Sequence, residues 1–260
     1  SGKANSASFP LVNPYQADYR GSYDAFISKL STSGSYLVYS TYLGGSDSDQ
    51  PGSNCIAENG GDVYICGSTT SADFPTFNAY QACLNGERDA FISHLSSTGS
   101  GLLFSTYLGG YDRDYGTAIE VEDLNIFLTG YTLSDDFPTI NPYQPTNARG
   151  SGGSDAFMTK LDSSGSIILF SPYLGGYDSD YGRDIAVDDQ AAYLIGWTDS
   201  LDFPTENPYQ AFRAGSSYDD VFASKISSCG SLLLFSTYLG GYSSDYGHGI
   251  AVNDSRVYLT

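Results

Sequence analysis

Residues 105–110 read STYLGG, and this stretch decides the fold because it recurs along the chain. The same six letters stand at residues 40–45 and 236–241, and SPYLGG stands at residues 171–176. The four stretches are 65, 66 and 65 residues apart. Self-similarity at a fixed period is typical of repeat architectures, in which each copy is one supersecondary unit. The chain therefore contains four copies of one unit.

Two further motifs keep the same spacing. Phe-Pro followed by Tyr-Gln occurs four times, starting at Phe9, Phe74, Phe137 and Phe203. A segment like DAFISKL also occurs four times, starting at Asp24, Asp89, Asp155 and Asp220. Because these motifs recur in a fixed order, we expect a single domain over residues 1–260. Its units begin near the four aspartates, and residues 1–23 complete the last unit.

Each unit is expected to hold four short strands. In the third copy they are residues 156–161, 167–173, 184–187 and 192–197, separated by turns of Ser, Gly and Asp. Four antiparallel strands per repeat form one blade of a β-propeller. The predicted fold is all-β, a propeller of four four-stranded blades. The Pro-rich segment after each fourth strand is predicted to be irregular, because Pro cannot donate to a strand ladder.

The two ends of the chain carry parts of one unit. Gly67 precedes Phe74 by seven residues, and Gly2 precedes Phe9 by the same interval. Residues 256–260, RVYLT, match the strand that comes before this Gly in other copies. We expect a ring closed by terminal segments that share one blade, which leaves no free sheet edge. Strand exchange between molecules and a window from a longer array fit the same register.

Several motifs together resemble the bacterial SBBP-type β-propeller repeat. They are DAFISKL, STYLGG with acidic residues after it, a short Ile-Ala-Val-Asp strand, and Val-Tyr-Leu-Thr. The match covers all four units. The resemblance implies a propeller in a secreted or surface protein and no common set of catalytic residues. The family name refers to seven blades, whereas this chain has four units.

The charge of the chain excludes some partners. Its 30 acidic and 11 basic residues give a formal net charge of −19. A surface of this sign repels phosphate backbones and anionic membranes, so nucleic acid is not an expected partner. No apolar run approaches the roughly 20 residues that a membrane-spanning helix needs. We therefore expect no membrane insertion.

The cysteines predict one disulfide bond. Cys55 and Cys66 flank a hairpin with a Gly-Gly turn, and counting outward from that turn places them opposite each other. Directly opposed residues in antiparallel strands lie close enough for a disulfide, and two buried free thiols are the alternative. Cys83 and Cys229 fall in loops of different copies and are expected to pair between molecules, if they pair. This usage favours an extracellular or cell-surface location.

The histidines do not predict an enzyme. His94 takes the place of a Lys in the other copies, and His248 takes the place of Thr117 and Arg183. Both are substitutions at variable polar positions, and nothing in the sequence supplies the oriented base that nucleophilic catalysis needs. The chain is therefore predicted to be non-enzymatic.

The acidic turn after each Gly-Gly suggests calcium. These turns are residues 46–49, 111–114, 177–180 and 242–245, with Asp in alternating positions. Oxygen ligands in flexible loops suit Ca²⁺, yet each turn has at most two carboxylates. Calcium binding is thus a hypothesis. The favoured interpretation is a solvated turn in which Asp side chains cap backbone N–H groups.

Tyrosine recurs at two positions of the unit. One set ends the second strand and the other follows the acidic turn: Tyr42, Tyr107, Tyr173 and Tyr238, then Tyr115, Tyr181 and Tyr246. Such rings can stack on sugars or on another subunit. Identical repetition favours packing between blades instead, and Trp197, which replaces Tyr131, is expected to be structural.

Two classes of function follow. The first is a non-enzymatic extracellular structural or adhesive module that self-associates, as the protomer of a surface fibre or polymer. The second is a glycan-binding, lectin-like or calcium-dependent propeller. The second would use loops that differ between copies, which are residues 17–23, 82–88, 145–154 and 211–219. The acidic, repetitive composition favours the first.

Overall fold

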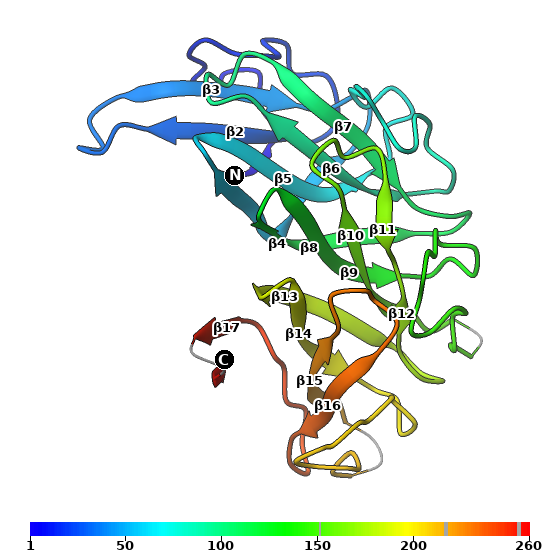
Figure 1. The fold of residues 1–260 in the computed structure, drawn as a ribbon. Coiled ribbons are helices and arrows are strands. Elements are labelled where there is room, and N and C mark those ends of the chain that lie inside the picture. Colours follow the sequence, from blue (N-terminus) through cyan, green and yellow to red (C-terminus); the bar gives the residue numbers. More distant parts are fainter. Residues whose placement is uncertain (151, 216–217, 254–255) are drawn as a thin grey trace.

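The computed structural model describes residues 1–150, 152–215, 218–253 and 256–260, and it is all-β (Figure 1). No helix occurs among these residues. The strands in chain order are β1 (Gly2–Ala4), β2 (Asp24–Leu30), β3 (Leu37–Leu43), β4 (Asp49–Asn59), β5 (Asp62–Thr69), β6 (Asp89–Leu95), β7 (Leu102–Leu108), β8 (Asp114–Glu122), β9 (Asn125–Thr132), β10 (Asp155–Leu161), β11 (Ile168–Phe170), β12 (Tyr173–Leu174), β13 (Asp180–Asp188), β14 (Ala191–Thr198), β15 (Asp220–Ile226), β16 (Leu233–Leu239), β17 (Ile250–Asn253) and β18 (Arg256–Leu259).

Consecutive strands build antiparallel sheets. Strands β4 to β7 pair in chain order, and so do β13 to β16. Strands β8, β9 and β10 form a third sheet whose last strand is split into β11 and β12. One parallel bridge between Asn54 and Ala118 joins β4 to β8. The expectation of short antiparallel strands in groups of four is therefore met in three sheets.

The sheets are out of phase with the units expected from the sequence. Asp89 begins β6, which is the third strand of its sheet, rather than the first strand of a blade. The Phe-Pro segment returns the chain from β5 to β6 within one sheet, whereas the Gly-Gly turn leads from β7 to β8 in the next. Each sequence unit thus contributes its first two strands to one sheet and its last two to another.

The terminal strands lie in separate sheets among the described residues. β1 pairs with β2 in a sheet of β1, β2 and β3, and β18 pairs with β17. Strand pairing among the described residues does not confirm the expected sharing of one blade by the two ends, and the C end lies apart from the β1–β3 sheet (Figure 1). β17 packs beside β13, and His248 O, just before β17, accepts a hydrogen bond from Asn54 Nδ2 of β4 at 3.2 Å.

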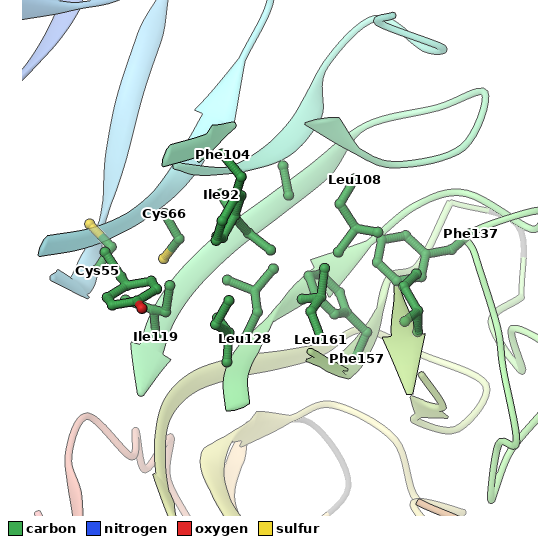
Figure 2. Close-up of a cluster of buried hydrophobic side chains, with 14 of the residues drawn as sticks. Cys55, Cys66, Ile92, Phe104, Leu108, Ile119, Leu128, Phe137, Phe157 and Leu161 are labelled. Atoms are coloured by element: carbon green, nitrogen blue, oxygen red, sulfur yellow. The ribbon is translucent and has the colours of Figure 1, made fainter. Parts of the chain in front are cut away.

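The hydrophobic core lies between successive sheets. Figure 2 shows one cluster in which Ile92 and Phe104 of one sheet meet Ile119 and Leu128 of the next. A second cluster continues the core between β8–β12 and β13–β16. Burial of such side chains contributes about 25 cal/mol per Å² of apolar surface, so packing between sheets is the main stabilising term.

An aromatic pair within each repeat fixes the Phe-Pro segment. The Phe of this motif packs against the Phe of the DAF motif, with ring centroids 4.3 to 4.6 Å apart. The four pairs are Phe9–Phe26, Phe74–Phe91, Phe137–Phe157 and Phe203–Phe222. Offset aromatic pairs at this distance add stability beyond their buried area.

The Pro-rich segment covers the outer edge of each sheet. It is irregular, as predicted, but it makes isolated bridges to the outermost strand, such as Phe77 with Ser105 and Gln81 with Tyr107. Asn78 adopts a φ of 47°, and its side-chain amide donates to Leu103 O at 3.3 Å. A covered edge cannot pair freely with another chain, so this segment protects the sheet.

Candidate ligand-binding site

Three carboxyl groups enclose the Gly-Gly turn that the sequence repeats. A methyl group on Gly109 would lie 2.6 Å from Asp114 Oδ2 and 2.7 Å from the Asp89 carboxyl. On Gly110 it would lie 2.2 Å from Asp136 Oδ1. Since a Cβ atom cannot approach other atoms so closely, only glycine fits either position. The turns at residues 44–45 and 175–176 are enclosed in the same way.

The last Asp of the first three acidic turns, Asp49, Asp114 or Asp180, is buried and serves the turn itself. The Asp114 carboxylate accepts hydrogen bonds from the Gly110 N–H at 2.8 Å, the Ser134 hydroxyl at 2.9 Å and the Thr132 hydroxyl. Burial raises the pKa of Asp114 to about 7 and that of Asp49 to about 6. The capping interpretation is confirmed for this Asp, but the group is buried rather than solvated.

A Gln side chain connects each variable loop to the Gly-Gly turn through hydrogen bonds. Gln81 Nε2 donates to Asp89 Oδ2 at 2.5 Å and to Cys83 O at 2.9 Å, and Gln81 Oε1 accepts from the Gly109 N–H at 3.0 Å. Asp89 also accepts from the Asn85 N–H at 3.0 Å. Gln16, Gln144 and Gln210 make the equivalent contacts. The Tyr-Gln motif therefore has a structural role that its spacing did not reveal.

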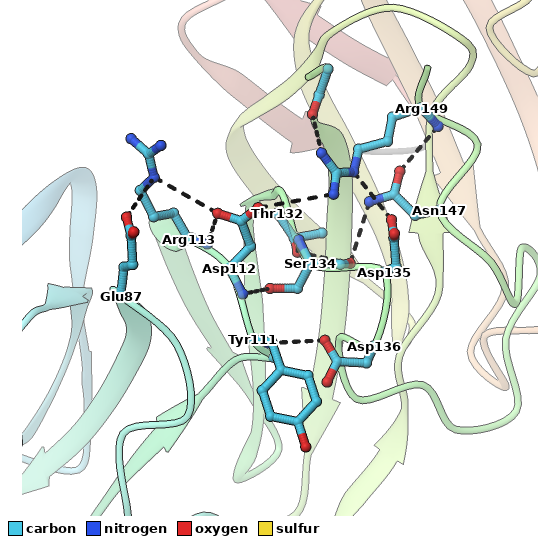
Figure 3. A network of polar contacts seen from close by, with 12 residues as sticks. Glu87, Tyr111, Asp112, Arg113, Thr132, Ser134, Asp135, Asp136, Asn147 and Arg149 are labelled. Carbon is cyan, nitrogen blue, oxygen red and sulfur yellow. Dashed lines mark hydrogen bonds and ion pairs between the residues drawn. The ribbon is translucent and has the colours of Figure 1, made fainter. Parts of the chain in front are cut away.

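The acidic side chains in and near the second turn make contacts with other groups of the protein. Figure 3 shows Arg149 between Asp112 and Asp135, with nitrogen–oxygen distances of 4.0 and 3.2 Å. The Tyr111 N–H donates to Asp136 Oδ1 at 2.9 Å. In the described part of the chain, no group of three or more His, Cys, Asp or Glu side chains is arranged to hold a metal ion. The calcium hypothesis therefore gains no ligand set from these residues.

Cys55 and Cys66 lie in one core cluster but are free thiols (Figure 2). The last regular pair before them is Ile56 with Ile65, and β4 bulges between Pro51 and Ile56. The Cys55 thiol donates to Gly52 O at 3.0 Å. Burial raises the pKa of the Cys66 thiol, and the neighbouring Cys55 adds to the rise. Both thiols are free in this structure, so the predicted disulfide is not present in it, although the Cys55 and Cys66 side chains are neighbours.

The other two cysteines, Cys83 and Cys229, are exposed. Hydrogen bonds with the hydroxyls of Ser227 and Ser231 lower the pKa of Cys229 to about 7. Their pairing between molecules stays a prediction.

His94 belongs to a polar pair that the sequence did not reveal. Its Nε2 lies 3.2 Å from Asp62 Oδ2, and its ring stacks on Tyr64 with centroids 4.0 Å apart. Burial lowers the pKa of His94. Tyr64 and His94 are directly opposed on β5 and β6, and this opposition is the signal from which the sequence could have predicted their contact. Among the described residues, no hydroxyl or thiol is hydrogen-bonded to this imidazole.

The tyrosines that end the second predicted strand are buried. Tyr107 Oη donates to Ser71 O at 2.7 Å and accepts from the Phe74 N–H at 3.0 Å. Its ring belongs to the same core cluster as Ile27 of the neighbouring sheet. Tyr42, Tyr173 and Tyr238 make the equivalent hydroxyl bonds. The packing interpretation is therefore confirmed for this set.

The tyrosines after the acidic turns form a different structure, which we call the aromatic row. It consists of Tyr115, Tyr131, Tyr181, Trp197 and Tyr246, with successive ring centroids 4.5, 4.8, 5.3 and 5.1 Å apart. Two cross-strand pairs supply four of its five rings, Tyr115 opposite Tyr131 and Tyr181 opposite Trp197. The rings are half-buried, and Tyr246 is exposed. The sequence placed these rings at equivalent edges but did not show that they join.

A cavity of about 350 Å³ lies at the Tyr115 end of the aromatic row. We call it the arginine cavity, since Arg88 and Arg183 line it together with Gln50, Ser68, Tyr115 and Tyr131. The guanidinium carbon of Arg183 lies 3.8 Å from the centre of the Trp197 ring. That of Arg88 lies 5.4 Å from the centre of the Tyr115 ring. Strands β4, β8 and β13 supply most of the walls, so three sheets meet there.

The variable loops do not form the arginine cavity, apart from Arg88. Loop 17–23 contributes to a smaller cavity with Asp73 and Pro75. Residue 151 of loop 145–154 and residues 216–217 of loop 211–219 lie outside the described residues. The expectation that a ligand would use these four loops therefore stays a prediction.

Comparison with known proteins gives no family. No protein-family model matches the chain. No curated protein matches it either. In the described residues there is also no helix long and apolar enough to cross a membrane.

Proposed function

We propose that the chain is a non-enzymatic adhesive module of the β-propeller type, acting outside the cytoplasm and binding glycans. Three groups of antiparallel strands in chain order, β4–β7, β8–β12 and β13–β16, the first two joined by one parallel bridge, support the blade architecture. The proposal includes a fourth blade, for which β17, β18 and the β1–β3 sheet carry strands of equivalent sequence. The resemblance to SBBP-type repeats and the acidic, Ser-rich and Tyr-rich composition support a surface or secreted location.

The aromatic row is the observation that carries the proposal. Aromatic faces and edges pack against the apolar faces of sugar rings, and half-buried rings lose little conformational entropy when they bind. The other repeated features already have internal roles, since the recurring Asp and Gln side chains hold turns and loops. The aromatic row is a repeated feature that keeps partly open surface and also borders a cavity.

The proposed function is non-enzymatic because of the hydrogen bonds that the buried carboxyl groups make. Acid–base hydrolysis of a glycoside needs two carboxyl groups in unlike environments that face the substrate. The buried Asp49 and Asp114 instead accept hydrogen bonds from their own turns. Binding without turnover is therefore the function that these contacts support best.

Glycan binding can be tested through Trp197, which is the only Trp of the chain and part of the aromatic row. We expect its fluorescence to change saturably when a binding oligosaccharide from a glycan array is titrated. Tyr181→Ala should abolish the response, while Tyr111→Ala, at an 80% exposed residue outside the row, should leave it unchanged. Absence of saturable binding to every glycan of the array would refute the proposal.

Self-association is a second candidate, and another set of tyrosines favours it. Tyr111, Tyr177 and Tyr242 follow the Gly-Gly of successive copies and are 80, 62 and 88% exposed. Exposed Tyr side chains are common anchors of protein interfaces. Concentration-dependent sedimentation that is lost in the triple Ser variant would support an assembling protomer. A monomer at all concentrations would exclude it.

A further inference from the structure

The arginine cavity is lined by positively charged side chains, whereas the chain as a whole has a formal net charge of −19. The sequence holds 30 acidic and 11 basic residues, yet the cavity is lined by two arginines and by no Asp or Glu. Arg113, Arg149 and Arg213 each lie within 4.0 Å of a carboxylate, whereas Arg20 and Arg256 lie outside the cavity and have no ion pair among the described residues. In the described part of the chain, neither Arg88 nor Arg183 has such a partner.

The two guanidinium groups are held in place without being neutralised. Arg88 Nη1 donates to Ser68 Oγ at 3.1 Å. Arg183 lies flat enough on Trp197 to bring its guanidinium carbon within 3.8 Å of the ring centre, and its Nε is buried without a hydrogen-bond partner among the described residues.

The cavity exists because one repeat departs from the others. Tyr115 opposes Tyr131, and Tyr181 opposes Trp197, so each of these sheets fills the position with two rings. In the sheet of β4 and β5 the same opposed pair is Gln50 and Ser68. Smaller polar side chains there leave the space that the rings fill elsewhere.

The arginines are also specific to this place. The residues at the position of Arg88 in the other copies are Tyr23, Ser154 and Asp219. The residues at the position of Arg183 include Thr117 and His248. Repetition would be expected of residues that the fold needs, whereas these two differ between copies and still meet at one cavity.

We propose that the arginine cavity binds the carboxylate of an acidic sugar residue, a uronic acid within a glycan. This inference rests on the proposed function of glycan binding and names the residue type that the site selects. A guanidinium binds a planar carboxylate through two parallel hydrogen bonds. Gln50, Ser53, Ser68 and Thr117 line the same cavity and offer donors and acceptors for sugar hydroxyl groups.

The net charge of the chain limits which acidic glycan fits. A formal charge of −19 repels a densely charged polyanion over a distance of about 10 Å at 0.1 M salt. An isolated uronic acid among neutral sugars avoids most of this repulsion and still reaches the arginines. The site therefore selects glycans with sparse acidic residues, not polyuronates.

The test uses two oligosaccharide probes of the same length, one with a single glucuronic acid residue and one with glucose in its place. Isothermal titration of the full chain should show at least about tenfold tighter binding of the acidic probe. Arg183→Gln and Arg88→Gln should each remove that preference. Arg113→Gln, which changes an arginine paired with Glu87 outside the cavity, should keep it.

A second variant keeps the test independent of folding defects. Gln50→Tyr with Ser68→Tyr restores the ring pair that the other sheets carry, so it should fold and should block the acidic probe. Equal binding of both probes, unaffected by Arg183→Gln, would overturn the acidic selectivity while leaving glycan binding intact. Failure of both probes and of every array glycan would overturn both proposals. Equal displacement by an acidic peptide would overturn the assignment to sugars.

Discussion

Gly109→Ala tests the role that the structure gives to the Gly-Gly motif. The added methyl group would lie 2.6 Å from Asp114 Oδ2 and 2.7 Å from the carboxyl of Asp89. Both carboxyl groups are fully buried, so neither can move into solvent without giving up its hydrogen bonds. One of these bonds is the 2.8 Å contact from the Gly110 N–H to Asp114.

The expected loss of stability follows from two contributions. Overpacking a buried site costs about 1–3 kcal/mol. Displacing Asp114 leaves a buried donor without its acceptor, which costs about 1–3 kcal/mol more. Replacing Gly by Ala returns only about 0.4–1 kcal/mol through the unfolded chain. The free energy of unfolding should therefore fall by about 2–4 kcal/mol, which lowers the Tm by roughly 5–15 °C for a chain of this size.

Thermal unfolding followed by circular dichroism measures this difference directly. The matched control is Gly101→Ala, where the nearest atom to the new methyl group is Ser96 Oγ at 3.9 Å. This variant should unfold at the wild-type temperature or slightly above it. If Gly109→Ala unfolds at the same temperature as Gly101→Ala, the carboxyl cage around the turn is not what requires glycine.

Three further outcomes are expected. Tyr107→Phe removes a hydroxyl that donates to Ser71 O and accepts from the Phe74 N–H. Urea unfolding should show that the free energy of unfolding falls by about 1–2 kcal/mol. An unchanged midpoint would contradict these hydrogen bonds. Burial raises the folded-state pKa of Asp114 to about 7, above the ordinary Asp value of 3.8, so the folded state holds a proton that the unfolded state releases. Stability should then fall as pH rises from about 4 to 7, less steeply in Asp114→Asn, and a rise over that window would refute the reasoning. Under native conditions at pH 7, iodoacetamide should modify exposed Cys229, whose pKa is lowered to about 7, and spare buried Cys66, as mass spectrometry can check; equal labelling would disprove the assigned burial.

The strand content could be predicted because repetition makes local signals reliable. The DAF motif and the STYLGG motif each occur four times, so a strand inferred in one copy is checked by three others. Alternating apolar residues and short Ser, Gly and Asp turns have a local physical cause, the pleat of a half-buried strand. The Tyr107 set was likewise identifiable as packing from its identical recurrence.

The grouping of strands into sheets could not be predicted in the same way. A repeat has no intrinsic starting point, and whether the Phe-Pro segment or the Gly-Gly turn crosses between sheets depends on packing of distant residues. Asp89 therefore begins the third strand of its sheet although its motif begins the unit in sequence. The bulge before Ile56 has a similar origin, and regular pairing ends there, one position short of Cys55 and Cys66.

Sequence alone determined the all-β class and the four copies, because these depend on composition and period. Tertiary structure decided which copies contribute to the site. Arg88 and Arg183 are 95 residues apart in the chain and occupy different positions of the repeat, so no local pattern connects them. They meet because β4, β8 and β13 pack side by side, and because Gln50 and Ser68 leave open the space that aromatic pairs fill in the neighbouring sheets.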